Sequence, residues 1–234
     1  MKDKVKRNFS KAAEKYDSLA TLQEKAGREL LRLYEMAGAP KPVLDLGAGT
    51  GRLLSGRGVV SLDIAPGMAR LCRKRGNLSV CGNGELLPFR EGSFKGVFTN
   101  FSLQWTEVDR VTEEVFRVLE KGGLFFLSVP VEGSLETLFK AWRRASGRAP
   151  GFRFPKEEEI FRKTAELFEV LTFRRLFLRE RFNSPREALK RVTGIGAKNP
   201  FVKASFKEAK RFREIYGEDP VVEYRVFLAV ARKT

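Results

Sequence analysis

The sequence predicts an α/β protein with a doubly wound, mostly parallel sheet of seven strands. The evidence is a set of seven short apolar runs and the helical stretches that separate most of them. Strands that alternate with helices pack side by side in parallel, with right-handed crossovers. The expected strands cover residues 42–46, 59–64, 78–81, 96–99, 123–130, 168–182 and 224–231. The last of these runs alternates in the manner of an edge strand that closes the sheet.

Helices are expected before, between and after these strands. Residues 8–10 suit the start of a short helix that ends at Tyr16, and a second helix is expected from residue 17 or 18 to Gly38. The stretch between residues 51 and 59 leaves room for a helix of at most about two turns. Residues 82–93 are expected to form a loop. Further helical segments are expected at 108–119, at 135–144, from 155 onward, from 184 onward and at 206–216.

The 234 residues are enough for one α/β domain with a helical insertion. We expect a single domain in four parts. These are a helical N-terminal cap at 1–40, a ligand-binding core at 41–132, a lid insertion with one strand at 133–200, and a C-terminal helix and strand at 201–234.

Composition narrows the cellular setting. No apolar run approaches the ~18 residues that a membrane span needs, and the N-terminus lacks the apolar stretch of a signal peptide. The two cysteines, Cys72 and Cys81, fit neither a disulfide framework nor a metal site of the CxxC type. We therefore expect a reduced, cytoplasmic protein without a membrane association or a metal site.

The chain contains no histidine. This excludes a histidine base, a serine–histidine or cysteine–histidine nucleophile, and histidine metal ligands. The chemistry must therefore proceed without a group that titrates near neutral pH, unless a carboxylate or a lysine is retuned.

The net charge of +16 is large for this length. A basic surface can attract a polyanion such as nucleic acid, or an acidic protein partner. Abundant Lys, Arg and Glu with little Gln is also a composition found in heat-adapted proteins. Because the basic residues are spread along the whole chain, the charge by itself does not choose among these three interpretations.

The strongest motif is a glycine-rich turn directly after the first expected strand. Asp45 lies near the end of that strand, and glycines follow at Gly47, Gly49 and Gly51. Glycine lets the backbone turn tightly and approach a ligand, and a helix that starts there offers N–H groups to it. A dinucleotide-binding GxGxxG pattern would need glycine where the chain has Arg52. The alternative is a plain strand, turn and helix with a capping aspartate.

This turn resembles the first motif of methyltransferases that use S-adenosylmethionine (SAM). The resemblance implies a Rossmann-like class I methyltransferase fold in which the core at 41–132 binds SAM. Asp63, at the end of the second strand, can accept hydrogen bonds from both ribose hydroxyls. The loop at 82–89 resembles the family segment beside the adenine, with Asn83 where an aspartate is commoner. The expected SAM contacts are Asp45, Gly47, Ala48, Gly49, Gly51, Asp63, Ile64, Met68, Asn83, Gly84, Glu85, Asn100 and Phe101.

Segments outside the core narrow the family. They are residues 8–17 of the cap, Leu103-Gln104-Trp105 after the fourth strand, Gly133-Ser134-Leu135, and the later bend Gly194-Ile195-Gly196-Ala197. Over residues 7–200 they resemble the malonyl-acyl-carrier-protein O-methyltransferases of biotin synthesis. That resemblance implies methyl transfer from SAM to the free carboxylate of a malonyl thioester on acyl carrier protein. An acidic acyl carrier protein would also suit the basic charge of the chain.

A carboxylate acceptor fits a chain without histidine. It is ionised at neutral pH, so it can attack a sulfonium methyl group without a base, and we expect no catalytic residue beyond groups that bind and orient. A cation should pair with the carboxylate. The candidates in segments expected to cover the pocket are Arg143, Arg144, Lys190 and Arg191, each of which is also a candidate surface residue.

Tyr16, Gln104 and Trp105 are the other expected substrate contacts. Tyr16 can close over the methionine end of SAM, close over the substrate, or simply pack the first helix, and Trp105 can also be a core residue. Three rival functions remain open: a methyltransferase for a quinone precursor or another carboxylate, a tRNA or rRNA methyltransferase, and a SAM- or nucleotide-binding module without activity. No RNA-binding module is apparent in the sequence, so nucleic acid is the less favoured partner.

Overall fold

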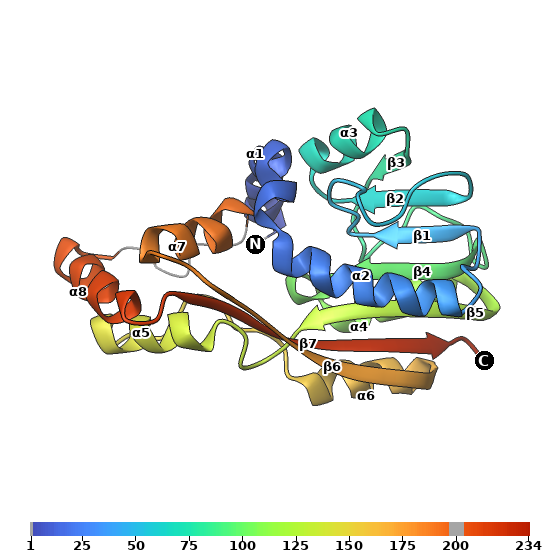
Figure 1. The fold of residues 1–234 in the computed structure, drawn as a ribbon. Helices are drawn as coiled ribbons and strands as arrows, with labels where there is room; N and C mark the ends of the chain where they lie inside the picture. Colours follow the sequence, from blue (N-terminus) through green and yellow to red (C-terminus); the bar gives the residue numbers. More distant parts are fainter. Residues whose placement is uncertain (1, 197–203) are drawn as a thin grey trace.

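The computed structural model describes residues 2–196 and 204–234. Its strands are β1 (Val43–Leu46), β2 (Val59–Asp63), β3 (Leu78–Cys81), β4 (Phe94–Asn100), β5 (Leu119–Pro130), β6 (Glu169–Arg181) and β7 (Val221–Arg232). Its helices are α1 (Lys2–Leu19), α2 (Thr21–Met36), α3 (Pro66–Lys74), α4 (Val108–Val118), α5 (Glu136–Ser146), α6 (Glu157–Leu167), α7 (Pro185–Gly194) and α8 (Phe206–Gly217), with a 3₁₀ turn η1 (Leu103–Trp105). Figure 1 shows their arrangement.

The strands form one seven-stranded sheet in the order β3-β2-β1-β4-β5-β7-β6. The first five pair in parallel, and β7 pairs antiparallel with both β5 and β6. The predicted doubly wound, mostly parallel sheet is therefore confirmed, and each expected strand is present within a few residues of its expected bounds.

The prediction that the last strand lies at an edge is wrong. β7 lies between β5 and β6, and β6 is the edge strand. Burial follows this order, because β7 is buried along almost its whole length while most of β6 is exposed. The composition agrees with it, since β6 carries six charged residues in thirteen whereas β7 carries three in twelve.

The core has two parts, one on each face of the sheet. On one face, α2 packs on the sheet, and its cluster continues into a lobe of α5, α7 and α8 around the projecting ends of β6 and β7 (Figure 1). On the other face, α4 and α6 pack on the sheet. A small third cluster joins α1 to α3 through Ala13, Ala65 and Met68. No helix among the described residues is long and apolar enough to cross a membrane.

The two N-terminal helices differ from their predicted bounds. α1 begins six residues before Asn8, where Val5 extends its buried face, and it continues past Tyr16 to Leu19. α2 begins at Thr21, not at residue 17 or 18. Asp17 does not cap α2, since its side chain accepts a hydrogen bond from the glycine turn instead.

The short helix expected between residues 51 and 59 does not form. This segment consists of turns, bends and irregular backbone. Gly56 and Gly58 have φ values of +95° and +81°, which an α-helix does not contain. Asn77 holds the segment instead, because its Nδ2 donates to the carbonyl oxygens of Gly51 and Leu54 at 3.1 and 3.4 Å.

The later glycine-rich bend begins one residue later than the segment Gly194-Ile195-Gly196-Ala197 expected from the sequence. Ser184 caps α7 by accepting a hydrogen bond from Glu187 N, as its sequence predicts. The helix then continues through Gly194, and the described part of the bend is a turn at Ile195 and Gly196. Ala197 lies outside the described residues.

Candidate active site

Two glycines of the turn lie so close to neighbouring side chains that a larger residue would not fit. Gly47 has φ +70°, and a Cβ there would lie 2.1 Å from Ser102 Oγ. Gly51 has φ +71°, and a Cβ there would lie 2.4 Å from Asn77 Nδ2. Both positions therefore need glycine for conformation and for space. The turn lies against β2, because the Gly47 amide donates to Leu62 O at 2.8 Å.

Asp63 ends β2 and connects that strand to the glycine turn. Its Oδ2 accepts from Gly49 N at 2.9 Å, and its Oδ1 accepts from Ala65 N at 2.8 Å. Burial raises the pKa of Asp63 to about 6, while the two backbone N–H groups limit that rise. Each carboxylate oxygen can accept more than one hydrogen bond. Asp63 can therefore still accept ribose hydroxyls from the cavity that it lines.

Asp45 has a buried carboxyl group, and one of its two oxygens accepts no hydrogen bond from the described residues. It is 4% exposed, and its Oδ2 has no hydrogen-bond partner among the described residues. Burial, and then the charge of Asp63, raise its pKa to about 8. Asp45 lines a cavity together with Ala48 and Gly49. A buried carboxyl in this position is the complement of a cationic group, and the ammonium of the methionine part of SAM fits it.

The loop after β3 supplies a polar wall. Asn83, Gly84 and Glu85 line the same cavity as Asp63, and Ile64 and Met68 give it an apolar side. The loop is held locally, because Asn83 Oδ1 accepts from Glu85 N at 3.2 Å. Glu85 Oε1 accepts from the backbone N–H at the N-cap of α4 at 3.0 Å. All five positions expected from this region thus face one cavity, which suits a flat ring with polar edges.

Asn100 and Phe101 form the wall at the end of β4. Asn100 Nδ2 donates to Gln23 O at 3.0 Å, and its Oδ1 accepts a hydrogen bond from Ser128 Oγ. Phe101 has a left-handed backbone with φ +53°, which is uncommon for a residue with a side chain. Both expected residues line the cavity that contains Asp63.

Three adjoining cavities lie at the carboxyl ends of the parallel strands. We call them the ribose cavity, which contains Asp63, the turn cavity, which contains Asp45, and the acceptor cavity, which lies against α5 and α7. The ribose and turn cavities share Gly49 and Asn100. Tyr16 lines all three, so the cavities meet around its side chain.

The acceptor cavity is mainly apolar. Its aromatic residues come from five separate parts of the chain and are Phe9, Tyr16, Phe101, Trp105, Phe139, Phe152, Phe154 and Tyr224. Gln104 and Trp105, both expected as substrate contacts, line it. The Trp105 ring lies 4.9 Å from that of Phe152 and 5.7 Å from that of Phe9, so it joins the lobe to α1. Trp105 is therefore a wall of the cavity.

The cations expected on α5 do not line any of the three cavities. Arg143 and Arg144 are exposed, because the helical period turns Trp142 and Ala145 inward. Arg143 pairs with Glu136 at 2.9 Å on the outer face of the helix. Sequence position alone placed these arginines near the pocket, whereas the period of the helix turns them away from it.

The cations expected on α7 also lie away from the acceptor cavity. Lys190 is exposed, because Ala188 and Val192 occupy the inner face. Arg191 instead contacts α1, where it donates to Ser18 O at 2.8 Å, and it pairs with Glu180 at 3.2 Å. Neither side chain lines the acceptor cavity.

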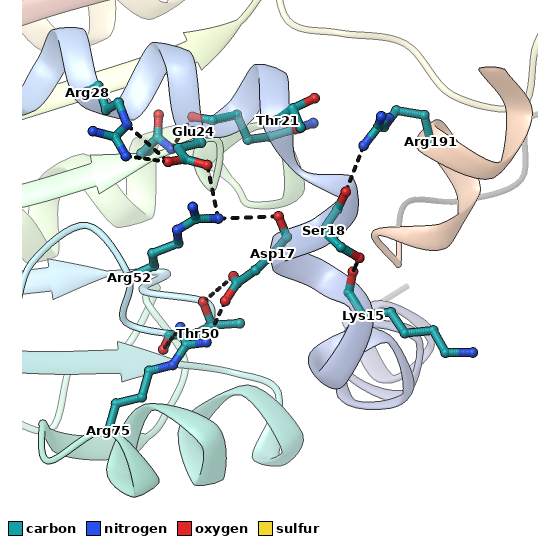
Figure 2. A network of polar contacts seen from close by, with 12 residues as sticks. Lys15, Asp17, Ser18, Thr21, Glu24, Arg28, Thr50, Arg52, Arg75 and Arg191 are labelled. Carbon is teal, nitrogen blue, oxygen red and sulfur yellow. Dashed lines mark hydrogen bonds and ion pairs between the residues drawn. The ribbon is translucent and has the colours of Figure 1, made fainter. Parts of the chain in front are cut away.

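A polar network connects the end of α1 to the glycine turn (Figure 2). Asp17 accepts hydrogen bonds from Thr50 Oγ1 at 2.6 Å and from Arg75 at 2.5 Å. Arg52 pairs with Glu24 of α2 at 2.9 Å and donates to Asp17 O at 3.3 Å. The network restrains the residue before Asp17, which is the tyrosine that lines all three cavities. Arg52, which departs from the dinucleotide pattern, therefore has a structural role.

The acceptor cavity also contains polar residues that the sequence analysis did not single out. Gln23 and Tyr224 are both buried, and Gln23 Nε2 donates to the Tyr224 hydroxyl at 3.4 Å. They are 201 residues apart in the chain, so no local pattern joins them. Of the two, only Gln23 could have been noticed in the sequence, since it is a polar residue within the apolar face of α2.

Comparisons with known proteins agree with this site. Residues 44–127 match a family model described as "Methyltransferase domain". The chain is 32% identical to the malonyl-[acyl-carrier protein] O-methyltransferase of Methylococcus capsulatus over 91% of this chain and 85% of that protein. It is also 32% identical to the biotin biosynthesis bifunctional protein BioHC of Cellvibrio japonicus over 85% of this chain, but it spans only 41% of that longer protein.

A solved structure of a SAM-dependent methyltransferase from Thermotoga maritima shares the fold. Its TM-score is 0.61 at 19% identity, with 97% of this chain and 99% of that chain covered. The predicted class I methyltransferase fold and the prediction of SAM as cofactor are thereby confirmed. The chain belongs to the malonyl-[acyl-carrier protein] O-methyltransferase family of SAM-dependent methyltransferases.

Proposed function

We propose that this chain transfers a methyl group from SAM to the free carboxylate of a malonyl thioester on acyl carrier protein, as a step of biotin synthesis. The observation that carries the proposal is the meeting of the three cavities at Tyr16. A methyl donor in the first two cavities and an acceptor in the third can touch at that point. The names of the relatives support malonyl-acyl carrier protein as the acceptor.

The proposed contacts to SAM follow the ends of the first two strands. Asp63 accepts hydrogen bonds from the ribose hydroxyls, and Asp45 pairs with the ammonium group. Asn83 lies beside the adenine, with Ile64 and Met68 on its apolar side. The unpartnered Oδ2 of Asp45 is the strongest support, because a buried carboxyl without a partner gains most from a cation.

Bound SAM supplies an electrophilic methyl group on a sulfonium. A carboxylate oxygen forms a bond to that carbon as the carbon–sulfur bond breaks, and the electron pair stays on sulfur, which gives a methyl ester and S-adenosylhomocysteine. No proton moves, because the carboxylate is already ionised at neutral pH. The protein contributes placement of the two reactants and exclusion of water by the aromatic walls of the acceptor cavity.

The basic surface supports an acidic protein partner. Arg143 and Arg144 are exposed on α5, and Lys190 is exposed on α7. The inner faces of the same two helices line the acceptor cavity through Phe139 and Val192. In this proposal these cations attract an acidic carrier protein to the lobe, and they do not hold the malonyl carboxylate.

A methylation assay with labelled SAM tests the proposal. The acceptors are malonyl-acyl carrier protein, acetyl-acyl carrier protein, free malonate, a quinone precursor and bulk tRNA. We expect a base-labile methyl ester on the malonyl form and no label on the acetyl form, which lacks a free carboxylate. Label on tRNA or the quinone precursor alone, or equal label on both carrier proteins, would refute the proposal.

A further inference from the structure

The point of methyl transfer is bounded by few residues. Under the proposed function, on which this inference rests, the reacting oxygen must lie where the acceptor cavity meets the cavities for SAM. Among the described residues, Tyr16 and Gln23 line both the acceptor cavity and the turn cavity. Phe9, Tyr16, Phe101 and Trp105 line both the acceptor cavity and the ribose cavity. Gln23 lies in the first turn of α2 and is 6% exposed. It is therefore a buried amide at the junction.

The main chain of Gln23 is anchored, while its side chain lies at the acceptor cavity. Asn100 Nδ2 donates to Gln23 O at 3.0 Å, and Asn100 is in turn bonded to Ser128 of β5. The side-chain Nε2 of Gln23 donates to the Tyr224 hydroxyl at 3.4 Å, which is at the outer limit of a hydrogen bond. A primary amide has two N–H donors, so this long contact leaves donor capacity for a ligand.

The hydroxyl of Tyr224, on β7, is a second hydrogen-bond donor at the acceptor cavity, next to Gln23. Its ring packs edge-on against Phe101 at 5.3 Å and Phe154 at 6.2 Å, and these contacts restrict the position of its hydroxyl. It is 4% exposed, and burial raises the pKa of its phenol. The hydroxyl therefore keeps its proton and can donate a hydrogen bond.

We infer that Gln23 and Tyr224 bind the acceptor carboxylate, through the amide N–H of one and the O–H of the other, and that this pair selects a carboxylate over a neutral acyl group. A carboxylate presents two oxygens that only accept, and hydrogen bonds to an ionised group are stronger than those between neutral groups. An acetyl thioester has a carbonyl oxygen but no ionised carboxylate, so it leaves both buried donors without this charged partner.

Two conservative variants test the inference through binding. Gln23→Met keeps the length of the side chain but removes its donors, and Tyr224→Phe removes one hydroxyl. The affinities for malonyl- and acetyl-acyl carrier protein are measured with S-adenosylhomocysteine bound, so that no turnover occurs. We expect each variant to reduce the preference for the malonyl form at least fivefold, with the affinity for S-adenosylhomocysteine within twofold of the wild type.

Tyr34→Phe is the matched control. Tyr34 is a buried tyrosine of α2 whose hydroxyl donates to Pro40 O at 3.1 Å, and it lines none of the three cavities. We expect its removal to leave the preference for the malonyl form unchanged.

The outcomes separate this inference from the proposed function. If the wild type does not methylate malonyl-acyl carrier protein, the proposed function fails and the inference fails with it. If the wild type is active but both variants keep the preference for the malonyl form, only the inference is overturned. Equal loss of affinity for both carrier proteins would show a structural role and would also overturn it. Tyr224→Phe alone decides the matter if Gln23→Met does not fold.

Discussion

Binding of SAM should remove a proton from Asp45. Burial, and then Asp63, raise the pKa of this carboxyl to about 8 in the empty site. At pH 7 about nine in ten molecules therefore carry the protonated form. A cationic group placed at the unpartnered Oδ2 favours the ionised form and lowers the pKa. We therefore expect binding at pH 7 to release most of one proton to the buffer.

Titration calorimetry in buffers with different ionisation enthalpies counts the released protons. The wild type should release most of one proton, and Asp45→Asn should release almost none. That variant should also bind SAM on the order of 10- to 100-fold more weakly, since a hydrogen bond to a charged group contributes ~1.5–3 kcal/mol. Asp3→Asn, an exposed change on α1, is the matched control and should behave as the wild type. Absence of proton release in the wild type, or equal release in Asp45→Asn, would refute this account of the site.

The same carboxyl makes the empty protein sensitive to pH. Its pKa rises from 3.8 in the unfolded chain to about 8 in the folded protein, so the folded state holds the proton more tightly. The stabilisation is fully present below about pH 4 and is lost as the pH rises through about 8. At about 1.4 kcal/mol per pKa unit, the loss is at most on the order of 6 kcal/mol. Urea unfolding between pH 5 and 9 should show a weaker pH dependence for Asp45→Asn.

Three further changes test other parts of the site. Asp63→Ala should weaken SAM binding by at least ~1 kcal/mol through the lost ribose hydrogen bonds, and an unchanged affinity by calorimetry would remove the residue from the cofactor site. Gly47→Ala should lower the free energy of unfolding by ~1–3 kcal/mol, because its Cβ would meet Ser102 at φ +70°, and an unaltered urea midpoint would contradict this. Arg143→Ala should change KM for malonyl-pantetheine less than twofold, since the side chain lies outside the acceptor cavity, whereas a tenfold rise would place it at the carboxylate.

The parallel part of the sheet was predictable because its signals are local. Each strand from β1 to β4 is one short apolar run, so its place in the chain was readable, whereas the order β3-β2-β1-β4 was not assigned from the sequence. The place of β7 was not predictable in this way. It pairs Leu124 with Arg232 on one side and Glu169 with Arg232 on the other, and these choices depend on contacts between distant segments. The burial of β7 between two neighbours is nevertheless consistent with its more apolar composition.

The half of the site proposed for SAM was also readable from the sequence. Asp45, Gly47, Asp63 and Asn83 all lie at or just after the ends of strands, and parallel strands bring their carboxyl ends to one edge of the sheet. The missing helix after Gly51 did not disturb this arrangement. The turn is held by hydrogen bonds to β2 and by the side chain of Asp63, so its position does not depend on a helix that follows.

The acceptor half differs because no single segment contains it. Its walls come from α1, α2, the β4–α4 connection, the lobe and β7. Which side chains line the cavity therefore depends on which face of each helix is turned inward. In α5 the inward face contains Trp142, and the arginine beside it in sequence lies outside. In α2 the opposite occurs, because Gln23 lies within the apolar face and is buried. A buried amide needs a hydrogen-bonding partner, so Gln23 indicated a polar contact in the interior. Its partner, Tyr224, lies in the last strand, and only the folded chain brings the two residues together at the acceptor cavity.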